Sequence, residues 1–72
     1  MELHGSLIDN LDAALASARR LRGHPVYKDT LSYWDELLQQ ARRARQDPSC
    51  TQPGVLDAAI AKMEIELAER AR

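Results

Sequence analysis

Two clusters of helix-breaking residues divide this chain of 72 residues into three segments. The first cluster runs from Gly23 to Pro25, where glycine can take the left-handed conformation that ends a helix and proline cannot continue it. The second is the sequence Asp-Pro-Ser-Cys-Thr-Gln-Pro-Gly over residues 47–54. Because both connections are short, consecutive helices should run antiparallel. The predicted helices span approximately residues 6–22, 26–46 and 53–71.

Apolar residues recur in each segment with the 3.6-residue period of an amphipathic helix. The first stripe contains Leu7, Ile8, Leu11, Ala14, Leu15, Ala18 and Leu21. The second contains Tyr27, Leu31, Trp34, Leu38 and Ala41, flanked by Val26, Tyr33, Leu37 and Ala44. The third contains Leu56, Ala59, Ile60, Met63 and Leu67. The predicted fold is all-α: one helical domain over residues 1–72, built as an antiparallel up-down-up three-helix bundle or as a long helical hairpin with a third helix.

Local signals also predict where the helices begin. Ser6 and Asp9 have the spacing of a capping box, with Asp in place of the usual Glu or Gln, so the first helix is expected to start near Ser6. The second helix could start at Pro25, which suits a first helical position, or later, with Asp29 or Thr30 as its cap.

Composition and length indicate how stable the folded chain can be and in which compartment it is expected. Apolar residues make up 44% of it and charged residues 29%, with a net charge of −1, which is typical of a folded protein. A core of this size seldom supplies more than about 3–5 kcal/mol, so pairing with a second chain is expected to add stability. The chain does not open like a signal peptide, and no segment has the length and hydropathy of a membrane span. We therefore expect a cytoplasmic protein.

Arginine is clustered at the ends of the first two predicted helices. Arg42, Arg43 and Arg45 could make electrostatic contacts, and together with the group at residues 19–22 they suggest an alternative function as a nucleic-acid-binding regulator. Acidic residues of neighbouring helices are expected to neutralise them: Glu2, Asp9 and Asp12 for the second cluster, and Glu64, Glu66 and Glu69 for the first. This internal pairing disfavours nucleic acid as the partner.

The sequence offers little for catalysis or for metal binding. His4, His24 and Cys50 are the only imidazole and thiol groups, and none has the paired spacing of a metal site. A three-helix chain that uses its Leu and Ala residues for a core also leaves little room for a substrate pocket. We therefore predict no catalytic residue, no cofactor, no metal site and no enzymatic activity.

Two helix faces carry apolar residues outside the main stripes and are candidates for binding a partner. Ile65 shares a second face of the third helix with Ala58, Ala61 and Ala68, and small residues permit the close approach of another helix. Tyr33 and Leu37 form a similar second face on the second helix. Burial within the bundle is the alternative for both faces. If they are exposed, Tyr33, Leu37 and Ile65 bind another protein chain, which could be a second copy in a homodimer.

These features favour a small, non-enzymatic adaptor or regulator that acts through an apolar helix face. The residues Leu11-Asp12-Ala13-Ala14-Leu15, followed by Arg19-Arg20, are similar to helices of co-chaperone subunits in type III secretion and of phage inhibitors of host regulators. That similarity would make the chain an accessory subunit or co-chaperone of a larger complex. The same pattern recurs in many unrelated helices, so it assigns neither a family nor a functional residue.

Overall fold

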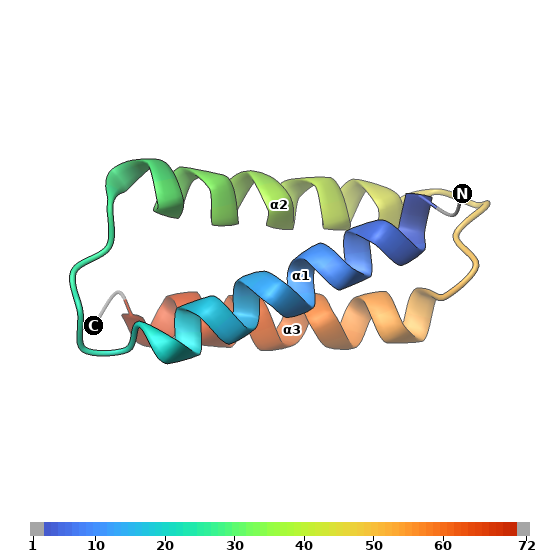
Figure 1. Ribbon diagram of the computed structural model, residues 1–72. Coiled ribbons are helices and arrows are strands. Elements are labelled where there is room, and N and C mark those ends of the chain that lie inside the picture. The colour runs from blue at the N-terminus through green and yellow to red at the C-terminus, as the bar shows by residue number, and fades with distance from the viewer. Residues whose placement is uncertain (1–2, 71–72) are drawn as a thin grey trace.

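The computed structural model describes residues 3–70, with side chains described from Ser6 onward, and it confirms the all-α three-helix bundle. The helices are α1 (Leu3–Arg20), α2 (Lys28–Gln46) and α3 (Pro53–Arg70). α1 and α3 run in one direction and α2 runs in the other, which is the predicted up-down-up order (Figure 1). All three pairs of helices are in contact, and α1 packs most extensively against α3.

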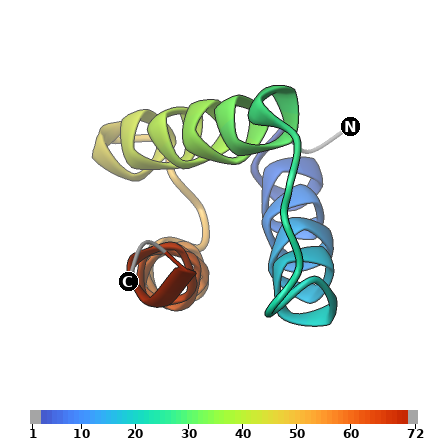
Figure 2. The same cartoon turned by 90° about the vertical axis from the view of Figure 1, so that its left-hand side faces the viewer.

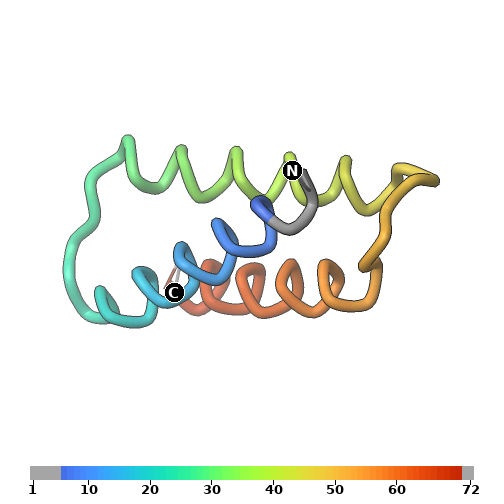
Figure 3. The backbone as a smooth tube through the Cα atoms, turned by 45° about the vertical axis from the view of Figure 1, so that its right-hand side comes forward, coloured from blue at the N-terminus to red at the C-terminus, as the bar shows by residue number. Residues whose placement is uncertain are grey.

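The three helices are not mutually parallel. Figure 2 shows α3 end-on, with α2 and α1 inclined to it on two different sides. The tube in Figure 3 shows α1 crossing obliquely, from the side of α2 towards the side of α3. The first and last helices therefore approach each other at their C-terminal ends, and this end of the bundle also holds the connection between α1 and α2.

The core consists of the inward stripes of the three helices, largely as their periodicity predicts. Its four largest fully buried side chains are Trp34, Leu11, Leu56 and Met63, each no more than 2% exposed. Small residues lie where helices approach closely, and Ala18 and Ala41 are fully buried. The other core residues are Ile8, Ala14, Leu15, Leu37, Leu38, Ala59 and Ile60.

The predicted helix boundaries need correction at three places. α1 begins at Leu3, so Ser6 lies inside the helix and the predicted capping box is wrong. α1 ends at Arg20, two residues earlier than expected, and Gly23 takes the predicted left-handed conformation with φ 78°. α2 begins at Lys28 instead of residue 26, because Tyr27 is extended and its carbonyl accepts the N–H groups of Thr30 and Leu31.

The start of α3 agrees with its sequence signal. Pro53 occupies the first helical position, where its missing N–H costs nothing. The Gln52 carbonyl accepts the N–H of Leu56 and closes the first turn. In the preceding connection, the N–H and hydroxyl of Ser49 both donate to the Asp47 carboxylate, an arrangement that stabilises a turn. The predicted end of the third helix, at residue 71, lies outside the described residues.

Candidate functional site

The structure separates the three residues predicted to bind a partner. Leu37 belongs to the core and is 4% exposed, because it points into the bundle beside Trp34 and Leu38. Tyr33 is 51% exposed and Ile65 is 60% exposed. The bundle therefore buries Leu37 and leaves Tyr33 and Ile65 accessible at its surface.

Ile65 lies on the face of α3 that points away from the other two helices. With 3.6 residues per turn, it is about 160–200° around the helix from the buried Met63 and the half-buried Leu67. The neighbouring residues of this face are Ala58, Ala61 and Ala68, and all three are exposed. Their spacings of three, four and three residues are those of a coiled-coil seam. We call these four residues, Ala58, Ala61, Ile65 and Ala68, the outer seam of α3.

Two charged residues border the outer seam on one side. Lys62 and Glu69 are both exposed and lie seven residues apart on α3. Neither side chain makes a hydrogen bond or an ion pair with another residue of the described part of the chain. On the opposite border, Asp57 and Glu64 are already paired with arginines of α2. One border of the seam thus carries two charges of opposite sign that form no ion pair within residues 6–70, although Glu69 also acts on Arg22 at longer range.

The arginine cluster of α2 pairs with α3, and not with α1 as the sequence analysis predicted. Arg42 donates to the Glu64 carboxylate, and Arg45 Nε donates to Asp57 Oδ1 at 2.8 Å. Arg42 and Arg45 are three residues apart and therefore share one face of α2, the face that meets α3. Of the predicted acidic partners, Glu2 lies outside the described residues. Arg43 is exposed, and no ion pair links it to another residue between 6 and 70.

The arginine cluster of α1 is confirmed to meet α3 through one of its predicted partners, Glu66. Arg22 forms a bidentate ion pair with the Glu66 carboxylate. Its Nε donates to Oε2 at 2.8 Å and its Nη2 donates to Oε1 at 2.5 Å. Arg19 adds a longer contact at 3.9 Å. The hydrogen bonds from Arg22, together with the positive charges around it, lower the pKa of Glu66 although its 4% exposure acts in the opposite direction. The same contact raises the pKa of Arg22.

Arg70, near the end of α3, joins all three helices. Its guanidinium donates to the carbonyls of Leu21 at 2.8 Å, His24 at 3.1 Å and Ala18 at 3.3 Å. It thereby adds hydrogen bonds to carbonyl groups at the end of α1, where the Leu21 carbonyl also accepts the N–H of His24. It also lies 5.6 Å from the ring centre of Trp34, within the range of a cation–π interaction. Its Nε is buried and has no hydrogen-bond partner among residues 3–70. Nothing in the sequence pattern signals this role, since Arg70 could equally have been a solvated end residue.

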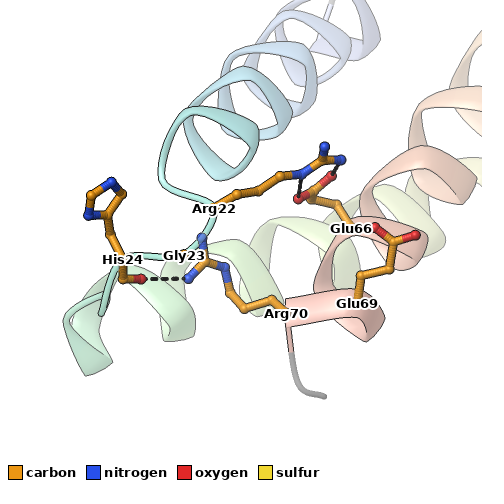
Figure 4. Close-up of a pocket in the computed structure, with 6 residues that line it drawn as sticks. All are labelled: Arg22, Gly23, His24, Glu66, Glu69 and Arg70. Atoms are coloured by element: carbon orange, nitrogen blue, oxygen red, sulfur yellow. Dashed lines mark hydrogen bonds and ion pairs between the residues drawn. The ribbon is translucent and has the colours of Figure 1, made fainter.

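These contacts surround an open pocket of about 400 Å³, where the sequence analysis had expected little room for one. It is lined by Arg22, Gly23, His24, Glu66, Glu69 and Arg70 (Figure 4). The Glu66 carboxylate is held by Arg22, and the His24 imidazole points away from that pair. The pocket therefore does not place the His24 imidazole beside the Glu66 carboxylate.

Two other residues were candidates for metal binding or catalysis, His4 and Cys50. His4 is among the residues whose side chains are not described, and Cys50 lies half-buried in the connection between α2 and α3. Within the described part of the chain, no three His, Cys, Asp or Glu side chains are grouped so that they could hold a metal ion. Between residues 3 and 70, no helix combines the length and the hydropathy that a membrane crossing requires.

A second pocket, of about 320 Å³, lies on the other side of Arg70, between α2 and α3. Its walls are Val26, Leu31, Leu67 and Arg70. The apolar periodicity of α2 predicts that Leu31 and Tyr27 are buried, but they are 41% and 86% exposed. The late start of α2 leaves Tyr27 outside the helix, and no neighbouring element covers Leu31 at this end. Leu31 and Tyr27 therefore form an exposed apolar surface, which the periodicity of α2 does not predict.

Comparison of the chain with protein-family models, with curated proteins and with solved structures found no match.

Proposed function

We propose that this protein is a small, non-enzymatic adaptor or regulator of the cytoplasm that acts by binding other protein chains, one of which is a second copy of itself. The observation that carries the proposal is the outer seam of α3, where Ile65 is 60% exposed in a row of small residues. Burying an aliphatic side chain of this size is worth about 1.5–3 kcal/mol. A two-fold dimer buries two such residues, and the alanines between them permit close helix approach.

The charges beside the outer seam favour an antiparallel pairing of two α3 helices. When the helices run in opposite directions about a centre near residues 65–66, Lys62 of each copy lies next to Glu69 of the other. A parallel pairing would instead place Glu69 next to Glu64 of the second copy, which is repulsive. It would also place Lys62 next to Asp57, whose carboxylate is already paired with Arg45. Charged residues that flank a seam commonly set the orientation of paired helices in this way.

Replacing Ile65 with glutamate tests the proposal. We expect the parent protein to sediment as a dimer at high concentration and Ile65→Glu to sediment as a monomer with the same helicity, because two carboxylates would be buried in the seam. Analytical ultracentrifugation and circular dichroism give the two readings. Loss of helicity in Ile65→Glu would show that Ile65 supports the fold, and a parent protein that stays monomeric would refute the homodimer.

A charge exchange tests the orientation and provides the matched control. Lys62→Glu replaces both attractive contacts of the dimer with repulsive ones, so its dimer should dissociate severalfold more readily, given about 0–1 kcal/mol for each exposed pair. The double variant Lys62→Glu/Glu69→Lys restores both attractive contacts and should dimerise like the parent. If the double variant is as weak as the single one, the antiparallel register is wrong.

A further inference from the structure

Ion pairs join α2 to α3 near one end of their contact, and a pocket separates the two helices near the other end. The pairs Arg42–Glu64 and Arg45–Asp57 cross this contact near the end of α2. Towards the start of α2, no ion pair joins these two helices within the described residues, and the apolar pocket of about 320 Å³ occupies the gap. For comparison, a cavity of about 150 Å³ lined by aliphatic side chains is large enough to bind benzene.

The pocket can hold an aliphatic side chain of another molecule. Val26 and Leu67 are half-buried and Leu31 is 41% exposed, so apolar surface lines the pocket and remains in contact with water. Tyr27 stands beside Val26 with 86% of its surface exposed, and accessible tyrosines contribute strongly to protein interfaces. Covering these groups removes apolar area from water, which is the main favourable term in protein association.

The charges around the pocket are positive. Arg70 forms one wall, and no residue that lines the pocket is acidic. Lys28 lies three residues before Leu31 and Asp35 four residues after it, so both share its face of α2. Lys28 lies on the side of the helix start, whereas Asp35 lies one turn further along and accepts a hydrogen bond from Gln39. Asp29 is about 200° around the helix from Leu31 and faces away. No side chain caps the start of α2, where the helix dipole is positive. A carboxylate placed at the mouth of the pocket would therefore meet complementary charge.

We propose that this pocket binds a segment of a partner protein in which a leucine-like side chain lies next to a carboxylate. The aliphatic group enters between Leu31 and Leu67, and the carboxylate lies near Lys28 at the start of α2. The proposal rests on the function proposed above, because it names the chemistry of a second protein that the adaptor recognises. It uses a surface separate from the outer seam of α3.

Nuclear magnetic resonance of the full chain, labelled with nitrogen-15, tests the site with two short peptides. One is acetyl-Asp-Leu-Leu-Asp-amide, and the other is acetyl-Lys-Leu-Leu-Lys-amide, which has the same leucines and the opposite charge. We expect the acidic peptide at millimolar concentration to shift the amide signals of Val26, Leu31 and Leu67, and the basic peptide to bind severalfold more weakly. Equal binding of both peptides, or no shift at these residues, would overturn the proposal.

A pair of charge-reversal variants separates this site from the outer seam. Lys28→Glu should weaken the acidic peptide about threefold or more, the scale of one or two exposed ion pairs. Its fold should survive, since an acidic residue suits the first turn of a helix. Lys62→Glu, which makes the same charge change on the outer face of α3, should leave peptide binding unchanged.

If both variants bind the acidic peptide like the parent, the assigned site is wrong. Failure here while Ile65→Glu still abolishes the dimer would reject the pocket and keep the function proposed for the outer seam. The reverse pattern, with peptide binding but no dimer, would keep the pocket and reject the homodimer. The two proposals can therefore fail separately.

Discussion

Removing the guanidinium of Arg70 should destabilise the bundle although the residue lies near the end of its helix. Arg70→Met keeps an unbranched apolar side chain and loses three donated hydrogen bonds to the end of α1. A hydrogen bond from a charged group contributes about 1.5–3 kcal/mol. Water can replace Arg70 at the more exposed carbonyls, so the net loss should be nearer to about 2 kcal/mol in total, including the contact with Trp34.

A loss of this size is large for so small a protein. The whole core is expected to supply about 3–5 kcal/mol, so Arg70→Met should lose roughly half of the folding free energy. For a domain of this length, about 1 kcal/mol lowers the melting temperature by roughly 4–8 °C. We therefore expect a decrease of about 8–16 °C. Thermal and urea unfolding followed by circular dichroism, with Trp34 fluorescence as a second probe, measure both quantities.

Two further variants show whether the effect comes from the contacts of Arg70. Arg20→Met removes the same charge from the neighbouring end of α1, where Arg20 is exposed, and should change stability by less than about 0.5 kcal/mol. Arg70→Lys keeps the charge and should fall between the parent and Arg70→Met, because one ammonium group cannot reach three carbonyls in the same way. If Arg70→Met unfolds at the same temperature as the parent, the reasoning is refuted.

Two other predictions concern the core and the buried ion pair. Leu56→Ala, at a fully buried position, should cost about 2–5 kcal/mol and leave the chain largely unfolded by circular dichroism, whereas Val55→Ala, at a 52% exposed position, should stay folded. The lowered pKa of Glu66 means that its ionised form stabilises the fold above the ordinary value of 4.5, and that this contribution is lost as the pH falls through the lower folded-state pKa. Urea midpoints should therefore converge for the parent and Glu66→Gln between pH 7 and pH 3, and parallel curves would contradict this account.

Periodicity and helix breakers predicted the number of helices, their order and most of the core. The inward stripe of α1 is a local property, because residues three and four apart always share a face of a helix. The breaks at Gly23 and Pro53 are also local, since they depend on the backbone geometry of single residues. Trp34 and Met63 could therefore be assigned to the core before any contact was known.

Other features depend on how the helices are inclined, and no local pattern contains that information. The same apolar stripe of α2 is buried at Trp34 and exposed at Leu31, because a neighbouring helix covers one position and not the other. Likewise, the sequence shows which charges are present but not which helix they face, so Arg42 was assigned to α1 and pairs with α3.

The sequence alone thus determined three amphipathic helices and the apolar outer seam of α3. Only the tertiary structure decided that Ile65 remains exposed, that Glu66 is buried beneath Arg22, and that Arg70 closes the end of α1. The physical reason is one of range. A helix and its faces follow from interactions within a few residues. Burial and ion pairing depend on side chains much further apart in the chain, by 12 residues for Arg45 and Asp57, 22 for Arg42 and Glu64, and 44 for Arg22 and Glu66.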